Sequence, residues 1–357
     1  MKYLKLFCAL AALALAACGG GGYGGSGNMP LATTSPPPVL ATTFKLTRLD
    51  ADTTTAGAAQ TDKNLVNAWG LAFNPTGFVW VANNGTNTST LYDGNGVVQS
   101  LVVATPAAPT GIVFNGSAVN FRGSPFVFST ESGVIAAWSP AVDRNNAIKV
   151  FDNGPTGAVY KGLALASYNN QSYLYATDFH NNRVDVYDAG FNKTALPGDF
   201  TDPGLPAGYG PFGIQAIGDR LYVSFARHAA TGDDEVHGAG LGIVDVFDTG
   251  GALIKQLLVA GALNAPWGMA MAPSNFGTLS GKLLVANFGD GKINAYDPVS
   301  GAFAGSLMQA DGSPVMIDGL WGIAFGNGLN SQPTNTLFFT AGPSDETHGL
   351  YGRLDMN

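Results

Sequence analysis

Cysteine is almost absent from this chain, which has only Cys8 and Cys18 in 357 residues. No cysteine follows residue 18, so the rest of the chain can form neither an internal disulfide nor a thiolate zinc site. A catalytic thiol is excluded from the same part of the chain, because the nucleophile in such sites is a cysteine thiolate.

Charge is scarce as well: charged residues make up 12% of the sequence, and 17 Lys and Arg stand against 25 Asp and Glu. Nucleic-acid-binding surfaces need clustered Lys and Arg, and no such cluster is present. We therefore expect no nucleic-acid partner. After Cys18 no apolar run reaches the length of a transmembrane helix.

The first eighteen residues, MKYLKLFCALAALALAAC, combine two lysines with a short apolar run and small residues before a cysteine. This order predicts a secretory signal peptide over residues 1–17. The ending Leu15-Ala16-Ala17-Cys18 resembles a bacterial lipobox, which implies cleavage before Cys18 and lipidation of its thiol. An ordinary signal peptide with a chance cysteine is the alternative. Several acyl chains would form a stable membrane anchor, and the following Gly19 favours the outer membrane.

Residues 18–43 are predicted to be a lipidated cysteine followed by a tether. The stretch GGGGYGGSG is flexible, and SPPP favours extended polyproline geometry. The tether would hold a globular domain over residues 44–357 clear of the lipid headgroups, with the lipid as its only membrane contact.

One phrase recurs six times in this domain: AWGLAF at 68–73, PTGIVF at 109–114, YKGLAL at 160–165, PFGIQA at 211–216, PWGMAM at 266–271 and LWGIAF at 320–325. A second apolar run follows each phrase, and a third usually ends in an aromatic residue and a turn former. The repeated glycines lie 41 to 55 residues apart, which is typical of four-stranded propeller blades with variable loops: Gly70, Gly111, Gly162, Gly213, Gly268 and Gly322.

Four antiparallel strands in each of six units predict an all-β fold, the six-bladed β-propeller. A pair of β-sandwiches is the alternative, and six near-equal units with one opening phrase disfavour it. The sixth unit shows three strands, whereas FKLTRLD at 44–50 is a surplus strand before the first unit. We expect residues 44–50 to supply the outer strand of the last blade and so to close the ring.

Longer phrases, among them NLVNAWGLAF, LNAPWGMAMAP and TNTLFFTAGPSDETHGLYG, resemble an uncharacterised family of secreted bacterial proteins. Some members of that family carry a PEP-CTERM sorting tail instead of a lipobox. Each unit is also similar to the NHL repeat, although Asn, Thr or Ser often replaces the Asp that follows the second strand in NHL blades. The resemblance covers residues 44–357 and implies a propeller fold and an export route, but no activity.

In a propeller the residues before each repeated glycine share one rim with the loops between second and third strands. This arrangement predicts a ligand surface on that rim, with inter-blade packing as the alternative role of its tryptophans. The candidate ligand-binding residues are Trp69, Lys161, Trp267, Trp321 and Arg227.

All four histidines fall in the same loops, and acidic residues accompany them, as in GDDEVHG at 232–238. Carboxylates and imidazoles that converge on a channel mouth suit a divalent cation such as calcium or zinc. A solvated polar loop is the alternative interpretation. The candidate metal ligands are Asp178, His180, His228, Asp234, His237 and His348.

Two classes of function follow from these features. The first is a membrane-tethered, extracytoplasmic binding module for a small molecule or a protein on the propeller rim. The second is a metal-dependent enzyme, a lactonase-like hydrolase or a lyase, with its site at the channel mouth. The stretch GYGPFG at 208–213 matches a dinucleotide-binding pattern, but it opens a strand and offers no helix terminus to a pyrophosphate.

Overall fold

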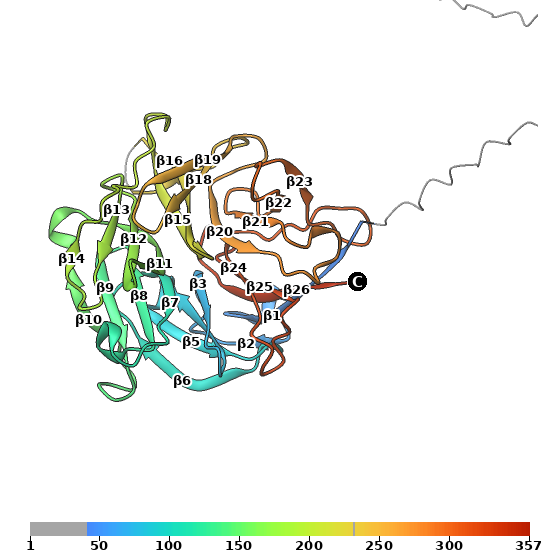
Figure 1. Ribbon diagram of the computed structural model, residues 1–357. Helices are drawn as coiled ribbons and strands as arrows, with labels where there is room; N and C mark the ends of the chain where they lie inside the picture. The colour runs from blue at the N-terminus through green and yellow to red at the C-terminus, as the bar shows by residue number, and fades with distance from the viewer. Residues whose placement is uncertain (1–40, 231–232) are drawn as a thin grey trace, which may run out of the picture. The chain divides into compact units, whose positions relative to one another are not determined.

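The chain forms six β-sheets that surround a central channel as the blades of a propeller (Figure 1). The computed structural model describes residues 41–230 and 233–357. The predicted six-bladed β-propeller is confirmed. The predicted signal peptide, the lipidation site Cys18 and most of the tether lie outside the described residues.

Five blades each use one continuous stretch of chain, with the first strand innermost. The first blade contains β3 (Ala68–Phe73), β4 (Val79–Asn83), β5 (Thr88–Tyr92) and β6 (Val98–Ala104). The second contains β7 (Pro109–Phe114), β8 (Phe126–Thr130), β9 (Val134–Trp138) and β10 (Ile148–Asp152). The third contains β11 (Tyr160–Tyr168), β12 (Gln171–Asp178), β13 (Arg183–Tyr187) and β14 (Lys193–Thr194).

The fourth blade contains β15 (Tyr209–Ile217), β16 (Arg220–His228), β18 (Ile243–Asp248) and β19 (Leu253–Val259), with the short β17 (Glu235–Val236) added to β16. The fifth contains β20 (Pro266–Met271), β21 (Leu283–Asn287), β22 (Ile293–Tyr296) and β23 (Phe303–Ser306). Short 3-10 turns occur at η1 (Thr54–Ala56), η2 (Asn84–Thr86), η3 (Asn120–Gly123), η4 (Gly154–Thr156) and η5 (Gly277–Leu279). Among the described residues no helix is long and apolar enough to cross a membrane.

The sixth blade joins the two ends of the propeller. Its sheet runs from β24 (Leu320–Phe325) through β25 (Leu337–Ala341) and β26 (Leu350–Met356) to β1 (Phe44–Ala51) and β2 (Gln60–Thr61). Strand β1 pairs antiparallel with β26, so that the blue and red ends of the propeller lie side by side in Figure 1. The predicted closure by residues 44–50 is confirmed, and β2 extends the sheet by a parallel pairing with β1.

The inner strands contact one another in a closed ring, in the order β3, β7, β11, β15, β20, β24 and back to β3. Glycine permits this approach. A Cβ atom at Gly70 would lie 2.6 Å from the carbonyl oxygen of Thr110, and one at Gly322 would lie 2.7 Å from that of Trp69. The repeated glycine therefore marks a point where neighbouring inner strands approach closely around the channel.

Candidate functional site

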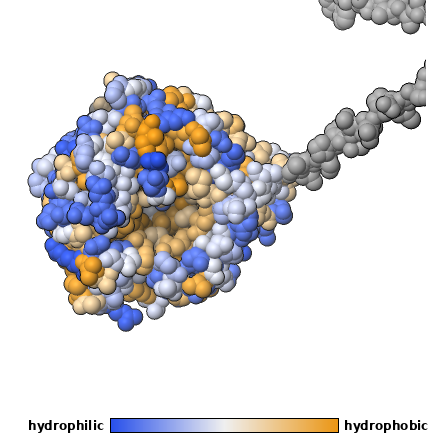
Figure 2. Space-filling view, in the orientation of Figure 1, coloured by the Kyte–Doolittle hydropathy of each residue, from blue (hydrophilic) through white to orange (hydrophobic). Residues whose placement is uncertain are grey.

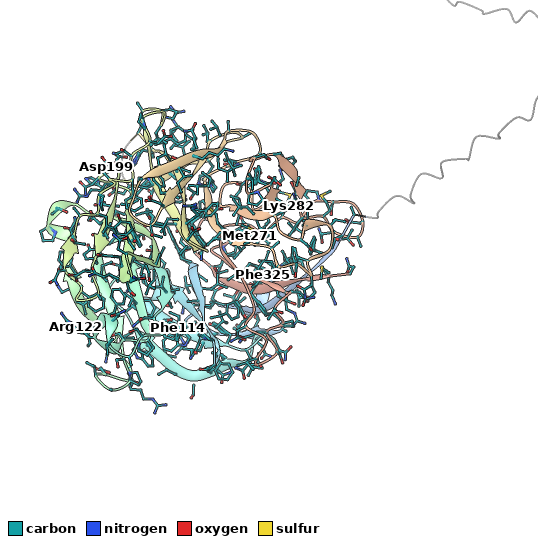
Figure 3. The ribbon with its side chains drawn as sticks, in the orientation of Figure 1. Phe114, Arg122, Asp199, Met271, Lys282 and Phe325 are labelled. Atoms are coloured by element: carbon teal, nitrogen blue, oxygen red, sulfur yellow. The ribbon has the colours of Figure 1, made fainter. Side chains whose placement is uncertain are left out.

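One end of the channel opens as an apolar funnel. Figure 2 shows the hollow at the centre of the propeller with a largely apolar surface, and Figure 3 places Phe114, Met271 and Phe325 around it. Two adjoining cavities of about 350 and 270 Å³ make up the funnel. Their lining includes Leu71, Phe73, Ile112, Phe114, Leu163, Leu165, Gln215, Ala216, Met269, Met271, Ile323, Ala324 and Phe325.

The repeated phrases account for the character of this wall. Three mostly apolar residues follow each glycine in the inner strand, as in Leu71-Ala72-Phe73. Each inner strand also lies at the end of its sheet, so one of its backbone edges has no partner strand among the described residues and faces the channel. Gln215 is exposed in the funnel, where its side chain is the only polar one among the described lining residues. The wall thus combines apolar side chains with unpaired backbone N–H and C=O groups.

No sequence pattern predicted the funnel, because the rim residues and loop histidines pointed to the opposite end of the channel. A signal was present: an apolar side chain at the first position after all six glycines. Its meaning depends on the ring, which turns six separate strands into one lining. The funnel narrows beyond these residues to a cavity of about 40 Å³ bordered by Gly70, Gly111, Gly268 and Gly322.

A buried aromatic cluster fills the other end of the channel. Trp69 stacks on Trp321 with ring centroids 3.6 Å apart, and Trp267 packs edge-on against both at 5.8 Å. Phe179, Phe212 and Phe288 complete the cluster. The three rim tryptophans are therefore brought together, but as core side chains that leave little surface for a ligand.

The indole nitrogens tie this cluster to neighbouring blades. Nε1 of Trp267 donates to the carbonyl oxygen of Lys161 at 2.9 Å, and Nε1 of Trp321 donates to Oδ1 of Asn67 at 3.1 Å. Nε1 of Trp69 is buried and has no hydrogen-bond partner among the described residues. The first bond links the fifth blade to the third, and the second links the sixth blade to the residue that precedes β3 of the first blade.

Charged side chains from four blades lie close to this aromatic cluster. Nζ of Lys161 lies 5.3 Å from the ring centroid of Trp69 and donates to Oε1 of Glu131 at 2.5 Å. Burial lowers the pKa of Lys161, but the carboxylates of Glu131 and Glu235 outweigh burial, so the net shift is upward. The cluster holds a buried ammonium in its charged form.

Two further carboxyl groups, those of Glu235 and Glu346, lie near Lys161, and burial favours their neutral form. Burial raises the pKa of Glu235, and the charge of Lys161 offsets part of that rise. Burial also raises the pKa of Glu346, to about 7, although Nδ2 of Asn67 donates to its Oε2 at 2.5 Å. Glu131 accepts a second hydrogen bond, from Nδ2 of Asn84 at 2.9 Å. The sequence placed these three glutamates among the acidic residues of one rim, but no pattern marked them as site residues, since they come from loops of three different blades.

Two of the four histidines lie near each other on the third and fourth blades. His180 pairs through Nδ1 with Oδ1 of Asp233 at 2.6 Å, and Nε2 of His228 pairs with Oδ1 of Asn182 at 2.7 Å. The ring of His228 packs on Phe179 at 4.0 Å, and this burial lowers its pKa. Both imidazoles already have polar partners.

The remaining metal-ligand candidates have separate environments. Asp178 is buried and accepts from Nδ2 of Asn181 at 2.8 Å, while His237 packs edge-on against Phe288. His348 pairs through Nδ1 with Oδ2 of Asp52 at 2.8 Å. Asp234 is exposed, as is Arg227, which was a candidate of the ligand-binding rim and not of the metal site. No three His, Cys, Asp or Glu side chains in residues 41–230 and 233–357 are grouped closely enough to hold a metal ion, and the divalent cation stays a sequence prediction.

Comparison with solved structures supports the fold. The chain resembles a streptogramin B lyase, with a TM-score of 0.52 at 13% identity over 88% of this chain and 98% of that one. It also resembles the soluble aldose sugar dehydrogenase of Escherichia coli, with a TM-score of 0.55 at 13% identity over 88% of this chain and 100% of that one. At this identity the likeness concerns the propeller architecture alone.

Sequence comparison finds viral relatives. The uncharacterised protein R648 of Acanthamoeba polyphaga mimivirus is 34% identical, covering 94% of this chain and 86% of its own length. The uncharacterised protein L690 of the same virus is 33% identical, covering 83% of this chain and 82% of its own length. No family model matches. The bacterial export route that the sequence suggested stays a prediction. The identity and coverage show that this six-bladed propeller belongs to the same protein family as R648 and L690.

Proposed function

We propose that this chain is an extracytoplasmic, membrane-tethered binding protein that holds an apolar small molecule in the funnel of its propeller channel. The observation that carries the proposal is the funnel itself, whose two cavities of about 350 and 270 Å³ are lined by apolar side chains from all six blades. Pockets of a few hundred Å³ with an apolar wall and a few polar groups are typical of small-molecule sites.

The chemistry of the wall favours binding over catalysis. None of the described residues that line the two cavities has an acidic, basic or nucleophilic side chain. General acid–base or covalent catalysis needs such a group within hydrogen-bond reach of the substrate. The funnel can therefore desolvate and orient a ligand through Gln215 and the free strand edges, but it has no side chain that would transfer a proton.

Burial of apolar surface supplies the affinity. A ligand that loses about 200 Å² of apolar surface gains about 5 kcal/mol at 25 cal/mol per Å². The loss of translational and rotational freedom on association offsets much of this gain. We expect affinity to follow the apolar area of the ligand, with polar groups contributing mainly orientation.

Filling the funnel should abolish this binding. In Ala216→Trp, an indole occupies the region where the two cavities meet, because Ala216 lines both. N-phenyl-1-naphthylamine, a neutral dye that fluoresces in apolar sites, should bind the wild-type protein and bind the variant at least about tenfold more weakly. Titration of dye fluorescence measures both affinities.

The matched control places the same ring elsewhere. Val142 is an exposed residue in the loop before β10, at 71% exposure, so Val142→Trp adds an indole without touching the channel. It should bind the dye as the wild type does, and both variants should melt at the wild-type temperature. A wild-type protein that does not bind the dye, or an Ala216→Trp variant that binds it equally well, would contradict the proposal.

The tether is tested through its cysteine. If the thiol of Cys18 carries lipid, Cys18→Ser should move the protein from the membrane fraction to the soluble fraction of a Gram-negative host, because the acyl chains supply the only predicted membrane contact. Cys8→Ser is the matched control, since residue 8 would leave with the signal peptide. Equal membrane retention of the two variants would overturn lipid anchoring.

A further inference from the structure

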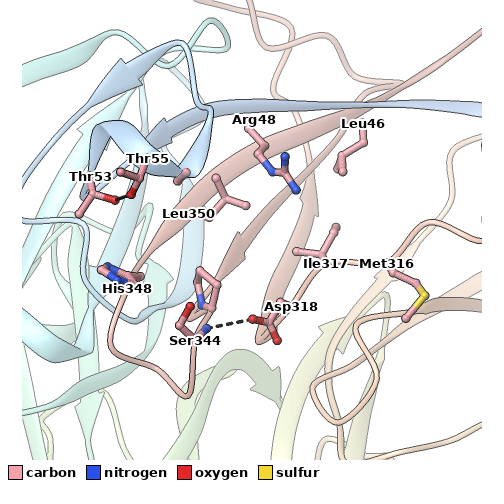
Figure 4. Close-up of a pocket in the computed structure, with 12 residues that line it drawn as sticks. Leu46, Arg48, Thr53, Thr55, Met316, Ile317, Asp318, Ser344, His348 and Leu350 are labelled. Carbon is pink, nitrogen blue, oxygen red and sulfur yellow. Dashed lines mark hydrogen bonds between the residues drawn. The ribbon is translucent and has the colours of Figure 1, made fainter.

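A second cleft, of about 480 Å³, opens on the flank of the sixth blade and shares no lining residue with the funnel (Figure 4). Strand β1 contributes Leu46 and Arg48, and the segment before β24 contributes Ile317 and Asp318. His348, just before β26, and Leu350, the first residue of β26, also line the cleft. The cleft forms only when β1 closes the ring, because β1 supplies one of its walls.

A buried carboxylate fixes the imidazole in this cleft. Oδ2 of Asp52 pairs with Nδ1 of His348 at 2.8 Å, and Oδ1 accepts from the backbone N–H of Gly349 at 3.0 Å. With Nδ1 donating to Asp52, Nε2 of neutral His348 has an unshared electron pair. Nε2 has no hydrogen-bond partner among the described residues, so it remains available to a donor in the cleft.

The turn that carries His348 is held in an unusual conformation. Ser344, Asp345 and Glu346 follow one another with φ values of 57°, 52° and 63°. Side chains of this kind rarely occupy the left-handed region, and such strain persists only where surrounding contacts impose it. Here Oδ2 of Asp318 accepts from the backbone N–H of Ser344 at 2.9 Å, the bond drawn in Figure 4. Asp318 thereby fixes both the turn and one wall of the cleft.

Two opposite charges stand in the same cleft without neutralising each other. The guanidinium of Arg48 makes no ion pair or hydrogen bond with any side chain in the described ranges, and Asp318 forms no ion pair there either. A guanidinium matches the two oxygens of a carboxylate, and an ammonium group complements a carboxylate. The lining of the cleft also includes the apolar side chains of Leu46, Ile317 and Leu350.

We propose that this cleft binds a zwitterionic amino acid with an apolar side chain. The carboxylate of the ligand pairs with Arg48, its ammonium group donates to Asp318 and to Nε2 of His348, and its side chain packs against Leu46, Ile317 and Leu350. The cleft is distinct from the funnel, and this second site does not depend on the function proposed above.

Three probes of one shape test the two charges separately. Leucine carries both, 4-methylpentanoate carries only the carboxylate, and isoamylamine carries only the ammonium group. The imidazole NMR signals of the four histidines report binding, with His348→Gln identifying the signal of His348 by its loss. Leucine should shift the His348 signal in a saturable way and leave those of His180 and His228 in place, and each single-charge probe should bind about tenfold more weakly.

Variants assign each charge to its partner. Arg48→Gln should weaken the binding of leucine and of 4-methylpentanoate about tenfold and leave the binding of isoamylamine unchanged. Asp318→Asn should weaken the binding of leucine and of isoamylamine and leave the binding of 4-methylpentanoate unchanged. Arg144→Gln, on an exposed loop of the second blade, is the matched control and should bind all three as the wild type does. The Ala216→Trp variant should retain the response to leucine, which separates this site from the funnel. A His348 signal that leucine does not move, or moves equally in Arg48→Gln, would overturn the proposal.

Discussion

Deletion of residues 44–50 is expected to abolish cooperative unfolding, since the sixth blade loses the strand that joins the two ends of the chain. Strand β1 pairs with β26 along most of its length, from Phe44 opposite Met356 to Ala51 opposite Leu350. Without it, β26 becomes an open sheet edge and β2 loses its partner. Differential scanning calorimetry should show no sharp transition for the shortened chain.

A single residue in the same strand should have a smaller effect in the same direction. Phe44 is buried, with its ring centroid 5.0 Å from that of Phe276, so Phe44→Ala leaves a cavity that costs about 3–5 kcal/mol. Lys45 is exposed, and Lys45→Ala should melt with the wild type. A shortened chain that retains the wild-type melting transition would show that β1 is an appendage instead of a closing strand.

Replacement of Asp50 by Asn is expected to stabilise the protein at pH 8 by about 2–4 kcal/mol. Asp50 lies in β1, fully buried, and neither of its carboxylate oxygens has a hydrogen-bond partner in residues 41–230 and 233–357. Burial, and secondarily the charge of Asp62, raise its pKa from 3.8 to about 7. An amide has nearly the same shape and removes the buried charge.

The pH dependence follows from the sign of this shift. Below pH 3.8 the Asp50 carboxyl is protonated in both the folded and the unfolded chain, so it costs nothing. Between 3.8 and about 7 the unfolded chain releases the proton while the folded protein keeps it, so stability falls as pH rises. Above about pH 7 the full cost is present. Urea unfolding from pH 4 to 8 should therefore show a shallower decline for Asp50→Asn than for the wild type.

Two comparisons make this experiment specific. Asp219 has an exposed side chain, at 85%, and Asp219→Asn should reproduce the wild-type curve. Asp245 is buried and, like Asp50, has no hydrogen-bond partner for either carboxylate oxygen in the part of the chain that the structure describes. Burial and the nearby Asp202 raise its pKa to about 8. Part of the decline with pH should therefore remain in Asp50→Asn. Equal stability of Asp50→Asn and wild type at pH 8 would contradict a buried, uncompensated charge at Asp50.

The strands of the propeller could be predicted from local sequence alone. Four of the repeated phrases coincide with inner strands residue for residue: AWGLAF with β3, PTGIVF with β7, PWGMAM with β20 and LWGIAF with β24. Alternating apolar residues and turn formers act over a few residues, so they specify strands without knowledge of the rest of the chain. The surplus strand at 44–50 followed from counting, since six blades of four strands need it.

Which side chains meet was decided only by the ring. Trp69 and Trp321 stack although about 250 residues separate them, and they pack as core side chains, the alternative role that the sequence left open for them. His348 was grouped with the other histidines by its loop, yet its imidazole faces Asp52, a residue that no pattern marked. Loop sequence shows which residues are polar, but the direction of each side chain depends on backbone conformation and on partners from other blades.

The sequence by itself determined the class of fold, the number of blades and the strand that closes them, because these depend on short-range periodicity repeated six times. Tertiary structure alone decided which cavities form. One is an apolar funnel made by residues that no single strand marks, and the other is a flank cleft whose charged residues, Arg48 and Asp318, lie 270 positions apart in the chain. Closing the ring brings these segments together, and no local sequence pattern encodes a contact between residues so far apart in the chain.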